Sequence, residues 1–65
     1  MKSYSSDEVI AMLKKAGWYE VNCRGDHYQF KHPFKKGRVT VTHPKKDIPL
    51  GTLKNIERQS GLKFK

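Results

Sequence analysis

The periodicity of the apolar residues changes twice along this chain, and this change constrains the fold more than any other feature. Three segments between positions 18 and 43 alternate apolar with polar residues and are rich in aromatic or β-branched side chains: WYEVNC, HYQFKH and RVTVTH. A period of two is typical of half-buried β-strands. The connections RGD and PFKKG are short and contain glycine, so the strands are expected to form an antiparallel meander.

Helical patterns flank the strands on both sides. In SSDEVIAMLKKAG, Ser5 and Glu8 have the capping-box spacing, which satisfies free amides at a helix N-terminus. Gly17 suits the left-handed conformation that ends a helix. The expected apolar face consists of Val9, Ile10, Leu13 and Ala16.

The segment IPLGTLKNIERQSG has the features of a second helix. Pro49 suits the first turn, and Gly61 suits the end. Gly51 leaves the exact start of this helix open. The expected inner stripe consists of Leu50, Leu53 and Ile56.

The order of these elements predicts one α+β domain over residues 1–65, with an α-β-β-β-α fold in which both helices cover one face of a three-stranded antiparallel sheet. Alternation then sorts the strand residues between the two faces. The core is expected to receive Tyr28, Phe30, Val39 and Val41. The uncovered face, called the open face below, is expected to hold His27, Gln29, Lys31, Arg38, Thr40 and Thr42.

Cysteine usage and hydropathy indicate the compartment. Cys23 is the only cysteine, so no disulfide can form within the chain and a reducing compartment is favoured. Its place on a strand before a turn favours a small buried apolar role. The first residues lack the apolar run of a signal peptide, and VIAML is too short to cross a bilayer. We therefore expect a cytoplasmic protein without membrane association, in which RGD (24–26) is a turn with Gly25 at positive φ rather than an adhesion ligand.

Positive charge is strong and unevenly placed. The chain carries 14 Lys and Arg against 6 Asp and Glu, a net charge of +8. From position 24 to 46 Asp26 is the only acid, among Arg24, Lys31, Lys35, Lys36, Arg38, Lys45 and Lys46. Such a concentration attracts polyanions and favours a nucleic acid over a merely solubilising role. The candidate phosphate contacts are Arg24, Lys31, Lys35, Lys36 and Arg38.

The candidate chemical groups are few. His27, His32 and His43 lack the thiolate pairs and tight spacing of zinc sites, and alternation places His32 and His43 opposite to His27. The chain has neither a glycine-rich phosphate loop nor a nucleophile elbow. We therefore expect neither a metal nor another cofactor.

RNA cleavage requires fewer protein groups than metal-dependent catalysis or hydrolysis by a serine nucleophile. The 2′-hydroxyl already lies next to the scissile phosphate, so the protein must orient it, move protons and stabilise negative charge. An imidazole, with an ordinary pKa of about 6.5, moves protons near neutral pH, and Lys or Arg stabilises the charge. His27, with Arg24, Lys31 and Arg38 within reach, meets these requirements, although a single strand histidine is more often structural or incidental.

Four motifs resemble, in order and spacing, those of the HicA-type toxins, which are small mRNA interferases of bacterial toxin–antitoxin pairs. These motifs are LKKAGW, RGDHYQFKHP, GRVTVTHPKKDIPLGTL and IERQSGL, and together they extend over nearly the whole chain. The most diagnostic elements are glycine-x-histidine at Gly25–His27 and GTL at Gly51–Leu53.

The resemblance implies a fold similar to that of double-stranded-RNA-binding domains, metal-independent cleavage of mRNA, and inhibition by a HicB-type antitoxin that covers the face of His27. The catalytic histidine of the family falls on His27, and its preceding glycine falls on Gly25. Two positions depart from the pattern: Asp26 stands where serine is common, and Thr42 where proline is frequent. An acidic group beside a scissile phosphate is electrostatically unfavourable, although it can also orient the imidazole.

Two other functions are compatible with the same residues. A non-catalytic double-stranded-RNA-binding module would use the basic and polar face to contact phosphates and 2′-hydroxyls. A small interaction protein would use the same face for an acidic protein partner. RNA cleavage by His27 variants and the salt dependence of RNA affinity distinguish the three.

Overall fold

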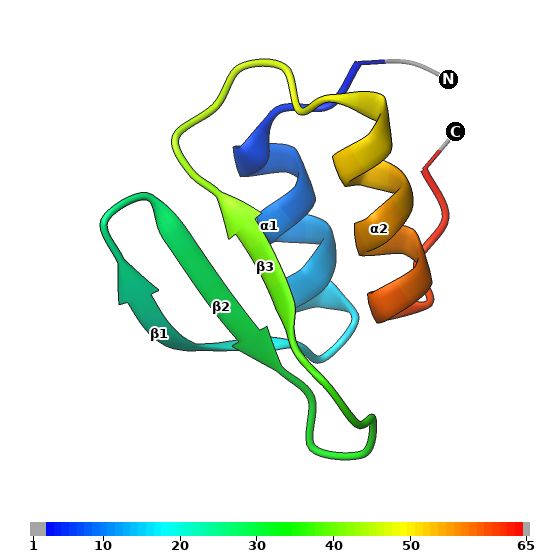
Figure 1. The fold of residues 1–65 in the computed structure, drawn as a ribbon. Coiled ribbons are helices and arrows are strands. Elements are labelled where there is room, and N and C mark those ends of the chain that lie inside the picture. Colours follow the sequence, from blue (N-terminus) through cyan, green and yellow to red (C-terminus); the bar gives the residue numbers. More distant parts are fainter. Residues whose placement is uncertain (1–2, 65) are drawn as a thin grey trace.

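The computed structural model describes residues 3–64, so residues 1, 2 and 65 of the predicted domain lie outside the described residues. The elements are α1 (Ser6–Lys15), β1 (Tyr19–Arg24), β2 (His27–Lys31), β3 (Val39–Thr42) and α2 (Leu50–Ser60). The predicted α-β-β-β-α fold, with a three-stranded antiparallel sheet in the order β1-β2-β3 and both helices on one face, is confirmed (Figure 1). Neither helix in this range is long and apolar enough to cross a lipid bilayer.

Helix α1 begins at the predicted capping box. The Ser5 side-chain oxygen accepts the Glu8 N–H at 3.2 Å, and Glu8 Oε1 accepts the Ser5 N–H at 3.0 Å. This reciprocal pair satisfies two amides that have no partner inside the helix. Beyond the other end, Gly17 has a φ of 99°, and a Cβ added there would lie 2.8 Å from His32 Nε2. Both the backbone conformation and the close approach therefore require glycine.

A tight turn joins β1 to β2. Gly25 has a φ of 59°, whereas Asp26 does not have a positive φ. Positive φ at only the first central residue matches a type II′ turn, whose twist suits a two-residue hairpin. Arg24 and His27 pair directly across this turn. The prediction of RGD as a turn is thus confirmed.

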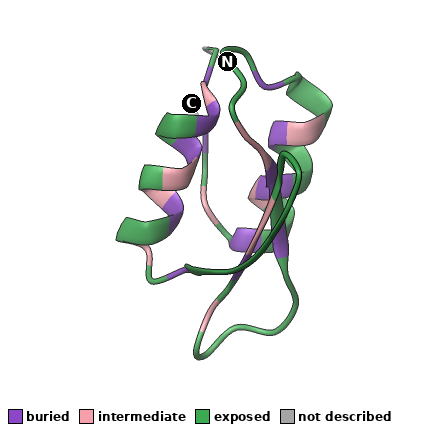
Figure 2. Ribbon diagram, turned by 90° about the vertical axis from the view of Figure 1, so that its left-hand side faces the viewer, coloured by how far each residue is buried: buried purple, intermediate pink, exposed green. Residues whose placement is uncertain are grey.

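The hydrophobic core lies between the sheet and the helices. Its strand residues are Phe30, Val39 and Val41, and the helices contribute Val9, Leu13, Leu53 and Ile56. In Figure 2 the outward sides of both helices are exposed and the buried positions lie inside the molecule. The prediction that Leu50 belongs to the inner stripe is wrong, because this side chain is 53% exposed. At about 100° per residue, Leu50 lies roughly 120° around the helix from Ile56 and points past the core.

Strand β1 extends beyond the part of the sheet that the helices cover. Every residue of β1 is exposed, and the helices lie on the side of β3, at the opposite edge of the sheet (Figure 1). The prediction that Cys23 is buried is therefore wrong, since its thiol is exposed and donates to the Gly25 carbonyl oxygen at 3.5 Å. A register shift between Glu20 and Asn22 forms a bulge, which is a common way to bend an edge strand.

Candidate active site

His27 lies on the open face at the end of the central strand, next to the turn between β1 and β2. It is the first residue of the central strand and pairs with Arg24 on β1 and with Thr42 on β3. Directly paired residues of an antiparallel sheet project to the same face, with Cβ atoms about 4.5–5.5 Å apart. The imidazole is therefore flanked by a cation on one side and a hydroxyl on the other, and 59% of its surface is exposed.

The Asp26 carboxylate lies beside the imidazole. Its Oδ1 lies 3.5 Å from His27 Nε2, which is an ion-pair distance for a protonated ring but too long for a good hydrogen bond. The Asp26 carbonyl oxygen accepts the His43 N–H at 2.8 Å, so the turn is also tied to the residue that follows β3. Asp26 is near enough to orient the ring, and it also adds a negative charge where a phosphate would lie.

Arg38 is held over the open face by a hydrogen bond. Its Nη1 donates at 2.6 Å to Oε1 of Gln29, which lies two residues beyond His27 on the same face of β2. One such bond leaves the other donors of the exposed guanidinium available for a bidentate phosphate contact. Lys31 follows on the same face and is exposed at the end of β2. Along the sheet from His27 there is thus a row of polar side chains, called the track below, which consists of Gln29, Arg38 and Lys31.

Two of the predicted lysines lie away from this track. Lys35 Nζ donates at 3.1 Å to the carbonyl oxygen of Ser60, at the C-terminus of α2, where the helix dipole favours a cation. Lys36 is exposed in the loop between β2 and β3. The structure therefore places Arg24 beside His27, with Gly25 in the adjoining turn, and Gln29, Arg38 and Lys31 farther along the same face. It places Lys35 and Lys36 beyond the end of the sheet.

The other two histidines are used to hold the fold together. His32 Nδ1 accepts the Phe34 N–H at 3.1 Å, so its hydrogen is on Nε2, which contacts the Ala16 carbonyl oxygen at 3.1 Å. His43 Nδ1 lies 2.7 Å from the Ser6 hydroxyl, and its ring packs edge-on against Tyr28 with centroids 5.1 Å apart. Of the three imidazoles, only that of His27 is without a close hydrogen bond among the described residues.

Tyr28 lies next to His27 in the chain but does not share its face. It pairs with Cys23 on the helix side of the sheet. A hydrogen bond with Cys23 is the main cause that raises the pKa of the Tyr28 hydroxyl, and the charges of Cys23 and Glu20 and partial burial act in the same direction. The phenol therefore keeps its proton at neutral pH and faces away from His27.

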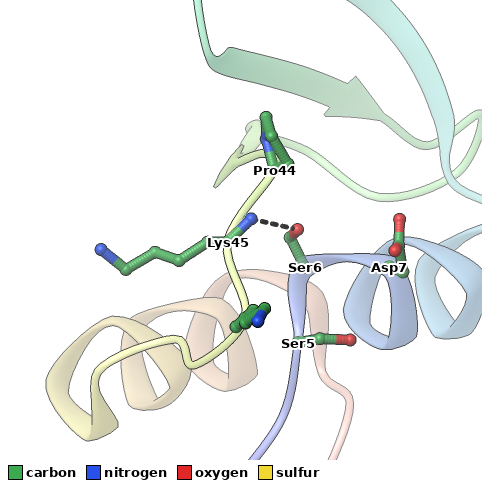
Figure 3. Close-up of a pocket in the computed structure, with 6 residues that line it drawn as sticks. Ser5, Ser6, Asp7, Pro44 and Lys45 are labelled. Atoms are coloured by element: carbon green, nitrogen blue, oxygen red, sulfur yellow. Dashed lines mark hydrogen bonds between the residues drawn. The ribbon is translucent and has the colours of Figure 1, made fainter.

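A cavity of about 190 Å³ lies at the N-terminus of α1, and Figure 3 shows it from close by. It is lined by Ser5, Ser6, Asp7, Pro44, Lys45 and Lys46. The Lys45 N–H donates to the Ser6 hydroxyl at 2.8 Å, and the Ser6 N–H donates to the Lys45 carbonyl oxygen at 2.8 Å. These bonds fasten the loop after β3 to the first turn of α1. The two serine hydroxyls of this cavity thus serve to hold the loop and the helix together, and the open face remains the candidate site.

Two residues beside the track were not among the predicted site residues. Asn22 pairs with Gln29 and so faces the open side, and alternation from Arg24 would have placed it there. Phe34 is 90% exposed in the loop after β2. The signal for Phe34 in the sequence is an isolated aromatic residue followed directly by two lysines.

Known proteins resemble this chain in sequence and in fold. The family model described as the HicA toxin of bacterial toxin–antitoxin systems matches residues 6–62. No curated protein matches the chain. A chain of the solved HicA3 and HicB3 toxin–antitoxin complex superposes with a TM-score of 0.85 and 29% sequence identity, over 95% of this chain and 100% of that chain.

The family match extends over most of the sequence and includes all five helices and strands. The solved chain repeats the same fold over its full length. The chain therefore belongs to the HicA family of toxins from bacterial toxin–antitoxin systems.

Proposed function

We propose that this chain is a metal-independent endoribonuclease that cleaves mRNA, with His27 as the catalytic residue. The observation that carries the proposal is the contrast among the histidines. His27 is exposed beside Arg24 on the open face, whereas the rings of His32 and His43 are held by hydrogen bonds at 3.1 Å and 2.7 Å. Membership of the HicA family supports the same assignment.

The proposed reaction uses the nucleophile that RNA itself supplies. His27 takes the proton of the 2′-hydroxyl as its oxygen attacks the adjacent phosphorus. The bond from phosphorus to the 5′-oxygen breaks, the departing oxygen takes a proton from a water molecule, and a 2′,3′-cyclic phosphate remains. Arg24, which pairs directly with His27, stabilises the negative charge that builds up on the non-bridging oxygens. Arg38, held by Gln29 farther along the open face, contacts a neighbouring phosphate.

RNA binding in this proposal relies mainly on charge. The candidate contacts are Arg24, Lys31, Lys36 and Arg38 to phosphates, Gln29 to the same strand, and the Gly25 turn, which lets the backbone come close. Nothing lies within 4 Å of a Cβ built on Gly25, so the turn is open to a ligand. Lys35 is a weaker candidate because its ammonium already bonds the Ser60 carbonyl oxygen.

A HicB-type antitoxin is the proposed partner, and it would cover the open face. The match to a chain of the HicA3 and HicB3 complex supports such a partner. The net charge of +8 favours fast capture by an acidic protein surface. Burial of His27, or blockage of the track beside it, would keep RNA out. Purified antitoxin should therefore abolish cleavage and compete with RNA, and a ternary complex that still cleaves RNA would rule out steric inhibition.

The reaction is tested with a labelled single-stranded RNA in excess chelator. We expect cleavage products with 2′,3′-cyclic phosphate and 5′-hydroxyl ends. The matched control is the same oligonucleotide with 2′-deoxy sugars, which should remain intact because it has no nucleophile. A strict requirement for divalent metal, or cleavage of the deoxy substrate, would contradict the mechanism. Tight RNA binding without any cleavage would instead assign the chain to the non-catalytic RNA-binding module.

A further inference from the structure

Phe34 is an unusual residue for the surface of this protein. Its side chain is 90% exposed, more than that of any other large apolar residue in the range 3–64. It lies in the loop between β2 and β3, which is exposed over nearly all its length and projects from the end of the sheet (Figure 2). Its one ring contact is with His32, at a centroid distance of 6.0 Å. Packing within the chain therefore does not explain an aromatic ring at this position.

The loop that carries Phe34 is fixed at several points. The Phe34 N–H donates to His32 Nδ1 at 3.1 Å. The other nitrogen of the His32 ring contacts the Ala16 carbonyl oxygen beyond α1. Lys35, the next residue, is tied to the Ser60 carbonyl oxygen at the end of α2. Pro33 restricts the backbone on the other side. An aromatic side chain on such a loop loses little conformational freedom on binding, so the ring is well prepared to contact a ligand.

The charge around Phe34 indicates the kind of ligand. The loop and the adjoining strand ends carry Lys31, Lys35, Lys36 and Arg38, and no acidic residue lies between Asp26 and Asp47. Sites that bind single-stranded nucleic acid combine cations along the backbone with aromatic rings on which the bases stack. Lys36 and Arg38 are exposed, and at least part of the Arg38 guanidinium is free for a phosphate.

We propose that Phe34 is a stacking platform for one base of single-stranded RNA; this inference rests on the proposed ribonuclease function and extends its binding site. The four steps from His27 to Lys31 correspond to about 13 Å of strand at roughly 3.3 Å per residue, and Phe34 lies beyond them. The stacked base is therefore some nucleotides away from the scissile bond. Between the two, the strand of RNA would run along the track of Gln29, Arg38 and Lys31.

A protein partner is the other class of ligand that an exposed phenylalanine suggests. Aromatic anchors of protein interfaces lie in well-packed apolar surroundings from which water is excluded. The residues adjoining Phe34 are instead a proline and two lysines, and the nearest ring is an imidazole. Cations around an isolated ring match the phosphates and the base of a nucleotide better than they match an apolar protein pocket.

The test measures the affinity of a labelled single-stranded RNA of about 12 nucleotides, a length within the usual site sizes for such proteins. All variants carry His27→Ala so that the RNA stays intact. Phe34→Ala should weaken binding by about 5- to 150-fold, and Phe34→Leu should weaken it similarly, because leucine has no π-face. Phe34→Trp should preserve affinity and show quenching of the new tryptophan by RNA. Leu50→Ala, at another exposed apolar residue, should bind like the His27→Ala parent.

The salt dependence separates stacking from charge. Phe34→Ala should leave the slope of log K against log salt unchanged, whereas Lys36→Ala should reduce its magnitude by about 0.7. Unchanged affinity in Phe34→Ala, or full affinity in Phe34→Leu, would overturn the stacking proposal while the parent still binds RNA and the proposed function stands. Loss of antitoxin binding without loss of RNA binding would overturn it in favour of a protein contact. A parent protein with no RNA affinity would overturn both proposals.

Discussion

The two faces of the sheet use the same residue type in opposite ways. On the side of the helices, His32 and His43 are part-buried, hydrogen-bonded at 3.1 Å and 2.7 Å and packed against the aromatic rings of Trp18 and Tyr28. On the open face, His27 is 59% exposed, and the Asp26 carboxylate is 3.5 Å away. A chain of 65 residues uses one face of its sheet to build a core. The open face is therefore the side of the sheet whose histidine is available to a ligand.

The largest expected effect is on the rate of cleavage by His27→Ala. If this imidazole moves a proton in the transition state, its loss should slow cleavage by about 10²–10⁴-fold, or roughly 3–5 kcal/mol of barrier. The free energy of unfolding should change by no more than about 0.5 kcal/mol, because the side chain is exposed. A cleavage time course and a thermal melt on one preparation check both values. A folded variant that cleaves at the parent rate would remove His27 from the mechanism.

The opposite pattern is expected for His43→Ala. This change removes the contact with the Ser6 hydroxyl that joins the end of β3 to the start of α1, together with the ring contact to Tyr28. The free energy of unfolding should fall by about 1–3 kcal/mol, as for other part-buried hydrogen bonds. Trp18, only 2% exposed, offers a fluorescence signal for the denaturant titration. Cleavage per folded molecule should stay within a few-fold, and a rate loss without destabilisation would reverse the roles of the two faces.

A smaller effect is expected for Arg38→Gln on the open face. Loss of one phosphate contact should reduce the magnitude of the slope of log K against log salt by about 0.7. Between 50 and 200 mM salt, the affinity of the variant for RNA should therefore fall by a factor that is roughly 2.6 times smaller than for the parent. The matched control is Arg58→Gln on α2, where the arginine bonds Asn55 and lies on a helix rather than on the open face. Equal slopes for the parent and Arg38→Gln would exclude this arginine from the track. An equal reduction of the slope in Arg38→Gln and Arg58→Gln would mean that RNA responds to the total charge of the protein and not to the charge of the open face.

The smallest effect is expected for Cys23→Ser. The thiol is exposed on β1 and lies on the helix side of the hairpin, opposite Tyr28. Cleavage should stay within a few-fold of the parent, and stability should stay within about 0.5 kcal/mol. The same two assays apply. Abolished cleavage in a folded Cys23→Ser variant would show that a residue on the helix side of β1 also contributes to cleavage.

Local signals predicted most of the fold. The capping box at Ser5, the glycines at positions 17, 25 and 61, and the alternation along β2 and β3 each depend on a few adjacent residues, and each appears in the structure as predicted. Strand β1 forms, but all its residues are exposed and a bulge interrupts its alternation. The two wrong predictions, burial of Cys23 and of Leu50, depend on where the helices lie across the sheet. Alternation assigns a side to each residue but does not say whether a helix covers that side.

The candidate site also has features that local patterns predict and features that they do not. Alternation along β2 and β3 is enough to place His27, Gln29 and Arg38 on one face, and the structure adds the hydrogen bond between the last two. By contrast, the bond from Lys35 to the end of α2 joins residues 25 positions apart and has no local signature. The loop of Phe34 is likewise held by His32, whose ring contacts the Ala16 carbonyl oxygen 16 positions away. Long-range contacts of this kind cannot be obtained from periodicity.

The division between the two faces is tested most directly by the ring signals of the three histidines in an NMR titration with RNA. A 2′-O-methyl RNA serves as the ligand, because it has no 2′-hydroxyl to attack and stays intact. We expect the His27 ring signals to shift or broaden, with those of the Gln29 side-chain amide, while the signals of His43 stay in place. The His32 ring, which lies next to Phe34, reports on the loop instead. Shifts at His43 with His27 unmoved would contradict the assignment of the open face as the RNA-binding face.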